Sequence, residues 1–60
     1  MLYTVECPNG VRGMRFAFQS DYLEAAILLS EVLSDRFECE VLVTQGDKIL
    51  AKHFEGTRVK

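Results

Sequence analysis

The sequence predicts one small α+β domain over residues 1–56, a two-layer β-β-α-β-β sandwich with one helix on one face of a four-stranded, mostly antiparallel sheet. Three observations predict this fold. Two segments with strand periodicity precede one helical segment, and two further strand segments follow it. Turn residues separate the strands within each pair. The length of 60 residues allows one domain, and we expect residues 57–60 to form a flexible basic tail.

Residues 2–7 and 12–19 are expected to form the first two strands, because apolar residues recur there at alternate positions. Asn9-Gly10 between them is a strong signal for a hairpin tip, since both residues tolerate positive φ. A slip of one residue from that tip would set Val5 opposite Arg15, so the pattern favours a single register. It places apolar residues opposite one another on one face: Val5 with Met14, Tyr3 with Phe16, and Met1 with Phe18.

A helix is expected from about residue 21 to about residue 35. Ser20 or Asp21 is expected to cap its N-terminus, and Glu24 follows Asp21 at the spacing of a capping box. A broad apolar stripe is expected to cover the sheet: Tyr22, Ala25, Ala26, Leu29, Val32 and Leu33.

Apolar residues of this helix extend beyond that stripe. Leu23, Ile27 and Leu28 lie outside it, so the apolar arc covers more than half of the helix circumference. A helix that packs on one side only usually has a polar face of comparable width. Because a chain of this length has no second layer to cover the extra residues, we expect another copy of the chain to cover them. The sequence therefore predicts a homodimer in which Leu23, Ile27 and Leu28 carry self-association.

Residues 37–44 and 48–55 are expected to form the third and fourth strands around a three-residue turn, Gln45-Gly46-Asp47. The expected inner-face pairs are Val43 with Ile49, Val41 with Ala51, and Cys39 with His53. The expected outer-face pairs are Leu42 with Leu50, and Glu40 with Lys52, which carry opposite charges. We favour the strand order 2-1-3-4, in which every neighbour is antiparallel. The order 1-2-3-4, with strands 2 and 3 parallel, is the alternative, and the crossover between them should be right-handed.

Cys7, Cys39 and His53 are the candidate chemical groups. In the favoured strand order all three fall on the inner face at one end of the sheet, and these residue types bind zinc. The sequence has no CxxC or HxxxH spacing, however, and a free cysteine packs as a small apolar residue. A Cys39–His53 nucleophile would also need an orienting group and a cleft, for which so small a domain has little room. We therefore expect no enzyme, cofactor or metal site, and keep a metal- or redox-responsive protein using these three residues as an alternative.

The outer sheet face is a second candidate contact surface. It is expected to present apolar and basic side chains to a partner: Arg15, Leu42, Leu50, Lys52 and Phe54. Basic groups beside an aromatic ring can bind single-stranded nucleic acid, which is a further alternative. Glu6, Glu38 and Glu40 share that face, and a net charge of -2 is unfavourable near phosphates, so nucleic acid is the less favoured partner.

The composition is that of a globular domain, 48% hydrophobic and 27% charged, which excludes intrinsic disorder. No segment approaches the roughly 20 apolar residues of a membrane span, and no signal-peptide pattern is visible. We therefore expect a cytoplasmic protein with free thiols and no membrane partner. The functional prediction is a small non-enzymatic interaction or regulatory module, a homodimer that binds another macromolecule, with a protein as the expected partner.

Overall fold

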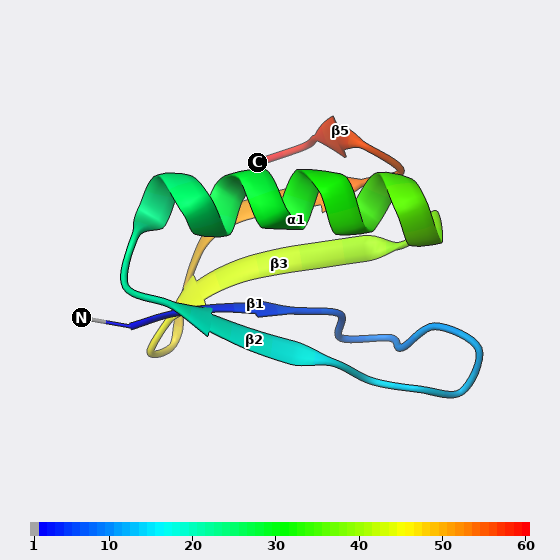
Figure 1. Cartoon of the computed structure of the whole chain (residues 1–60), viewed down its shortest axis with the longest axis horizontal. Helices are drawn as coiled ribbons and strands as arrows, with labels where there is room; N and C mark the ends of the chain where they lie inside the picture. The colour runs from blue at the N-terminus through cyan, green and yellow to red at the C-terminus, as the bar shows by residue number, and fades with distance from the viewer. Residues whose placement is uncertain (1) are drawn as a thin grey trace.

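The computed structural model describes residues 2–60 and places one helix across one face of a sheet (Figure 1). No helix among these residues is both long and apolar enough to cross a membrane. The elements in chain order are β1 (Tyr3–Glu6), β2 (Ala17–Ser20), α1 (Leu23–Phe37), β3 (Glu40–Gln45), β4 (Lys48–Phe54) and β5 (Thr57–Arg58).

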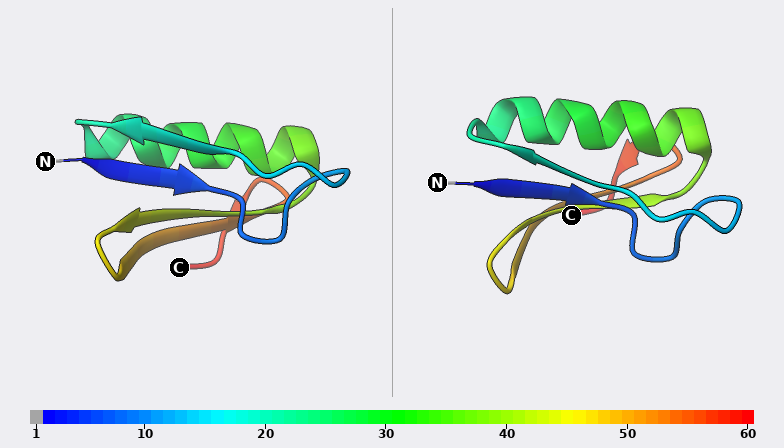
Figure 2. Two further views of the ribbon diagram at one scale, coloured as in Figure 1. Left: turned by 90° about the horizontal axis from the view of Figure 1, so that it is seen from below. Right: turned by 60° about the horizontal axis from the view of Figure 1, so that its bottom comes forward.

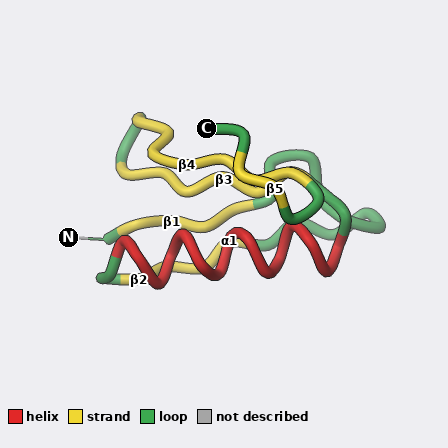
Figure 3. The backbone as a smooth tube through the Cα atoms, turned by 90° about the horizontal axis from the view of Figure 1, so that it is seen from above, coloured by secondary structure: helices red, strands yellow, loops and turns green. Residues whose placement is uncertain are grey.

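The sheet has the order β2-β1-β3-β4-β5, and every neighbouring pair is antiparallel. This confirms the favoured order of the first four strands and rules out the alternative with strands 2 and 3 parallel. The predicted strand number was wrong, because the segment expected to be a tail contains β5. Glu55 and Gly56 both have positive φ and turn the chain back, so that Thr57 pairs with Phe54. Strands β2 and β5 therefore form the two edges of the sheet, and Figure 3 shows β1 lying between β2 and β3.

The predicted register of the first hairpin was wrong. Val5 pairs with Phe18, four residues beyond Met14, and the second strand begins at Ala17. The tip lies at Arg12-Gly13, where both residues have positive φ, between the bridged residues Val11 and Met14. The loop between β1 and β2 consequently reaches past the C-terminal end of α1 in Figure 2.

Asn9-Gly10 belongs to an earlier turn in that loop, closed by a hydrogen bond from Gly10 N to Cys7 O of 3.3 Å. Pro8 occupies the second position of this turn, which suits its fixed φ. Since the register shift is an even number of residues, each strand residue keeps its predicted face. The expected pairing of Met1 with Phe18 lies outside the described residues.

The register of the second hairpin also differs from the prediction. Gln45 pairs with Lys48 around a two-residue turn, and an irregularity between Val43 and Thr44 leaves Leu50 as an extra residue. As a result, His53 lies opposite Val41, and Cys39 precedes the paired segment. The predicted Glu40–Lys52 ion pair is present at 3.1 Å, although the two residues are diagonal neighbours.

The capping box predicted at the helix start was wrong. The helix begins at Leu23 after the N-cap residue Tyr22, and no side chain caps it. Ser20 lies in β2, where its Oγ accepts a hydrogen bond from Tyr22 N at 3.1 Å and so helps to turn the chain from strand to helix. At the other end, Glu38 has a left-handed conformation and Cys39 N donates to Ser34 O at 3.1 Å, which closes the helix.

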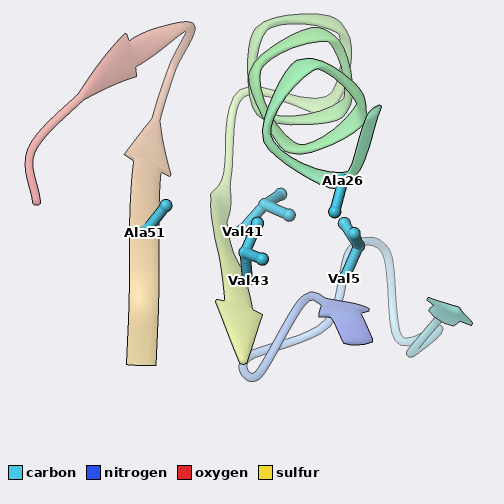
Figure 4. Packing of buried hydrophobic residues seen from close by; sticks show 5 residues of the cluster. All are labelled: Val5, Ala26, Val41, Val43 and Ala51. Atoms are coloured by element: carbon cyan, nitrogen blue, oxygen red, sulfur yellow. The ribbon is translucent and has the colours of Figure 1, made fainter. Parts of the chain in front are cut away.

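The core lies between the sheet and α1 and is built from small apolar side chains (Figure 4). Its fully buried members are Val5, Ala26, Val41, Val43 and Ala51. The apolar stripe predicted to cover the sheet was only partly right. Ala26, Leu29 and Leu33 do pack into the core, whereas Tyr22, Ala25 and Val32 are exposed.

Candidate functional site

The side of α1 that faces away from the sheet carries an apolar surface. Three of its residues follow one another at spacings of three or four, and the N-cap residue Tyr22 comes just before them. Together they define the outer helix stripe: Tyr22, Ala25, Leu28 and Val32. The exposed fraction is 75% for Tyr22, 61% for Leu28 and 51% for Val32. None of residues 2–60 covers these side chains, so the stripe is available to another molecule.

Small and polar residues occupy the buried side of the same helix. Ala26, Ser30 and Ser34 are each four residues apart and are fully buried. Short side chains there let the helix approach the sheet closely. The two hydroxyl groups are satisfied, since Ser30 Oγ donates to Ile27 O at 2.8 Å and Ser34 Oγ donates to Glu31 O at 2.9 Å. The helix therefore turns small residues inward and leaves several large apolar residues outside.

Of the three residues predicted to carry self-association, the structure brings two to the surface. Leu28 is 61% exposed and Leu23 is 37% exposed, whereas Ile27 packs against the core. Sequence periodicity missed Tyr22 and Val32 as surface residues. The prediction depended on which side of the helix faces the sheet. Ser30 and Ser34 lie on that side, but serine is a residue type that usually faces solvent, so the sequence did not reveal the buried side.

Acidic side chains border the outer helix stripe. Glu24, Glu31 and Asp35 are all exposed, and their spacing of seven and four residues places them along one flank of the helix. The stripe is thus apolar at its centre and negatively charged along one side.

The outer sheet face is a smaller candidate surface. Leu42 pairs directly with Lys52 and Glu40 pairs with Phe54, so these side chains share the face opposite the helix. Phe54 is exposed, while Leu42, Leu50 and Lys52 are half-buried. The Lys52 ammonium group is held by Glu40.

Arg15 was predicted for the outer face but lies in the loop before β2. Its Nη2 donates a hydrogen bond to Pro8 O at 2.6 Å. The predicted basic pair of Arg15 and Lys52 therefore does not form one patch on the strands.

The three candidate chemical groups separate into two sites. The Cys7 and Cys39 sulfur atoms are 3.6 Å apart. His53 instead has its Nδ1 atom 2.7 Å from Ser30 Oγ, beneath the helix. Among residues 2–60, no three or more histidine, cysteine or acidic side chains are grouped so that they could hold a metal ion.

Burial shifts the protonation of two of these groups. Burial, followed by the hydrogen bond and charge interaction with Cys7, raises the pKa of Cys39 to about 11. Burial is also the main reason that the pKa of His53 is lowered. At neutral pH the Cys39 thiol and the imidazole are therefore uncharged, which suits their place beside the core.

A hollow of about 340 Å³ lies beside the loop between β1 and β2. From the length of the sequence we expected little room for a pocket of this size. The hollow exists because the loop between β1 and β2 is longer than predicted. Glu6, Cys7, Pro8, Arg15, Phe16 and Ala17 line it. The Arg15 guanidinium is engaged with Pro8 O, and the Cys7 thiol donates to Cys39.

No protein-family model, curated protein or solved structure matches the chain.

Proposed function

We propose that the chain is a non-enzymatic protein-interaction module that self-associates as a homodimer through the outer helix stripe. One observation supports this most strongly: large apolar side chains occupy the solvent side of α1 while serines occupy its buried side. Isolated apolar residues on a surface are ordinary, but a row of them along one helix face is typical of an interface.

The size of the stripe indicates a weak dimer. The helical part of the stripe runs over seven positions, from Ala25 to Val32, which corresponds to about 10 Å of helix. Complete burial of an exposed Leu or Val side chain contributes roughly 1.5–3 kcal/mol. Two copies of such a short row must also offset an association cost of about 4–15 kcal/mol. We therefore expect a dissociation constant in the micromolar range or above.

The acidic flank gives this dimer a characteristic response to salt. In an antiparallel pairing about a two-fold axis, the flank with Glu24, Glu31 and Asp35 borders the same flank of the partner. Like charges at the edge of the interface repel, and salt screens that repulsion. The homodimer should therefore tighten as ionic strength rises.

The outer sheet face stays open in this dimer, because it lies on the side of the sheet away from α1. Phe54, with Leu42, Leu50 and Lys52 around it, is the surface that we assign to a protein partner. A cytoplasmic location and the absence of enzymatic activity belong to the same proposal.

Analytical ultracentrifugation over a wide concentration range tests the dimer. The variants are Leu28→Lys and Val32→Lys, and lysine is chosen because it is a good helix former. Both should remain folded by circular dichroism and shift the equilibrium to monomer. Leu2→Lys is the matched control, since Leu2 is 51% exposed but lies off the helix, and it should dimerise as the wild type does. A wild-type protein that is monomeric at hundreds of micromolar, or a Leu28→Lys variant with unchanged mass, would contradict the proposal.

A further inference from the structure

Cys7 and Cys39 are separated by 32 positions in the sequence but are brought together by the pairing of β1 with β3. Cys7 follows the last residue of β1, and Cys39 precedes the first residue of β3. The Cys7 thiol donates a hydrogen bond to Cys39 Sγ at 3.6 Å. Each sulfur atom is therefore already in contact with the other.

We propose that Cys7 and Cys39 form a reversible intramolecular disulfide, and that this pair is a thiol–disulfide exchange site for a low-molecular-weight disulfide such as glutathione disulfide. The proposal is independent of the homodimer, because neither cysteine belongs to the outer helix stripe.

Closure of the disulfide requires only a short movement. The two sulfur atoms must approach from 3.6 Å to about 2.05 Å. Backbone hydrogen bonds hold both residues in place: Cys7 N donates to Phe16 O at 3.3 Å, and Cys39 N donates to Ser34 O at 3.1 Å. Both cysteines lie at strand ends, next to a turn, where the backbone adjusts more easily than in the middle of a sheet.

The two thiols differ in access, which assigns their roles. Cys39 is half-buried, whereas Cys7 has an exposed fraction of only 2%. Cys39 is therefore the attacking thiol, and Cys7 completes the disulfide.

The exchange proceeds in two displacements. Cys39 loses its proton to solvent, and its thiolate attacks one sulfur of glutathione disulfide, which breaks that S–S bond and releases one glutathione thiolate. Cys7 then loses its proton and attacks Cys39 Sγ, which releases the second glutathione thiolate. The two cysteines lose two electrons, glutathione disulfide gains them, and the two protons pass through solvent to the glutathione products.

The rate of the first step depends on how much of Cys39 is thiolate. Because its pKa is about 11, only a small fraction is ionised at neutral pH. The rate of oxidation should therefore rise about tenfold per pH unit through neutral and mildly alkaline pH. The reduced pair is thus expected to be slow to react and to persist under brief oxidative exposure.

Equilibration of the full chain in glutathione redox buffers tests the proposal. Acid-quenched samples are analysed by intact mass and peptide mapping, and the disulfide equilibrium constant is compared between the native state and concentrated urea. The native value should be larger on the order of 100-fold, since a disulfide compatible with the fold stabilises the native state. Equal constants in the two states would overturn the proposal, as would glutathione attached to both cysteines without ring closure.

Two variants serve as controls for connectivity. Cys39→Ser and Cys7→Ser each retain one thiol and should accumulate only a glutathione mixed disulfide or a linked dimer. Cys39→Ser keeps this control informative if the more buried Cys7 position does not tolerate serine. In the Leu28→Lys variant the intramolecular disulfide should form as in the wild type, which separates this test from that of the homodimer. A disulfide found only between two chains would refute the intramolecular pairing.

Discussion

Replacement of Ser30 with alanine tests the hydrogen-bond chain that joins α1 to β4. Ser30 is fully buried and His53 has an exposed fraction of 1%. Ser30 Oγ lies 2.8 Å from Ile27 O and 2.7 Å from His53 Nδ1. The hydroxyl has one proton, which it donates to Ile27 O. His53 Nδ1 must therefore carry its own proton and donate to Ser30 Oγ, a tautomer that follows from the network.

The size of the effect follows from what the substitution leaves behind. Without the hydroxyl, the Nδ1–H of His53 stays buried and loses its partner, which costs about 1–3 kcal/mol. Alanine is a better helix former than serine and recovers about 0.5 kcal/mol. The expected net loss is thus about 0.5–2.5 kcal/mol. A domain of this length has a total stability of roughly 3–9 kcal/mol, so the change should be easy to measure.

Urea unfolding followed by circular dichroism measures this loss, and a double-mutant cycle isolates its cause. His53→Leu removes the group that Ser30 satisfies. In that background Ser30→Ala should be neutral or slightly stabilising, because no imidazole remains to lose a partner. The coupling between the two sites should therefore be about 1–3 kcal/mol, because the helix-propensity gain is common to both backgrounds and cancels. Equal destabilisation by Ser30→Ala in both backgrounds would refute the hydrogen-bond chain and assign the loss to packing alone.

Two further predictions concern the helix end and the response to pH. Glu38 has a φ of 51°, a left-handed conformation that costs most residues roughly 1–2 kcal/mol. Glu38→Gly should therefore raise the free energy of unfolding, measured by urea titration, by about 0.5–1 kcal/mol. Glu38→Ala, the control, should give no gain, because alanine meets the same steric cost. Burial lowers the pKa of His53 below its ordinary value of 6.5, so the unfolded chain binds this proton more readily than the folded chain. The contribution of His53 to the free energy of unfolding should be fully present above about pH 6.5 and should decrease as the pH falls below that value. His53→Gln should make the free energy of unfolding less dependent on pH in this range. If the variant shows the same pH dependence as the wild type, other groups cause the decrease.

Much of the fold could be predicted because strand and helix periodicities are local properties. The alternation of Val5 and Cys7, or of Val41 and Val43, assigns each to the inner face without knowledge of the partner strand. The ion pair of Glu40 with Lys52 also survives a shift of register, because long side chains reach diagonal neighbours.

The candidate surface was harder to predict than the fold. The excess of apolar residues on the helix was visible in the sequence, but which of them face solvent was not. Ser30 and Ser34 gain buried partners only through the tertiary structure: His53 for the first, and Gly56 N, at 3.0 Å, for the second. Their inward orientation turns Leu28 and Val32 outward.

The sequence by itself determined the succession of the first four strands and the helix along the chain, the inner face of the first three strands, and the presence of more apolar surface than one helix face can bury. It favoured one of two spatial strand orders, and the tertiary structure decided between them. The tertiary structure decided the registers, β5, the inward side of the helix and the contact between Cys7 and Cys39. The physical reason is that these features depend on positive φ at residues such as Arg12 and Glu55, and on hydrogen bonds between distant elements. Neither leaves a periodic signal along the chain.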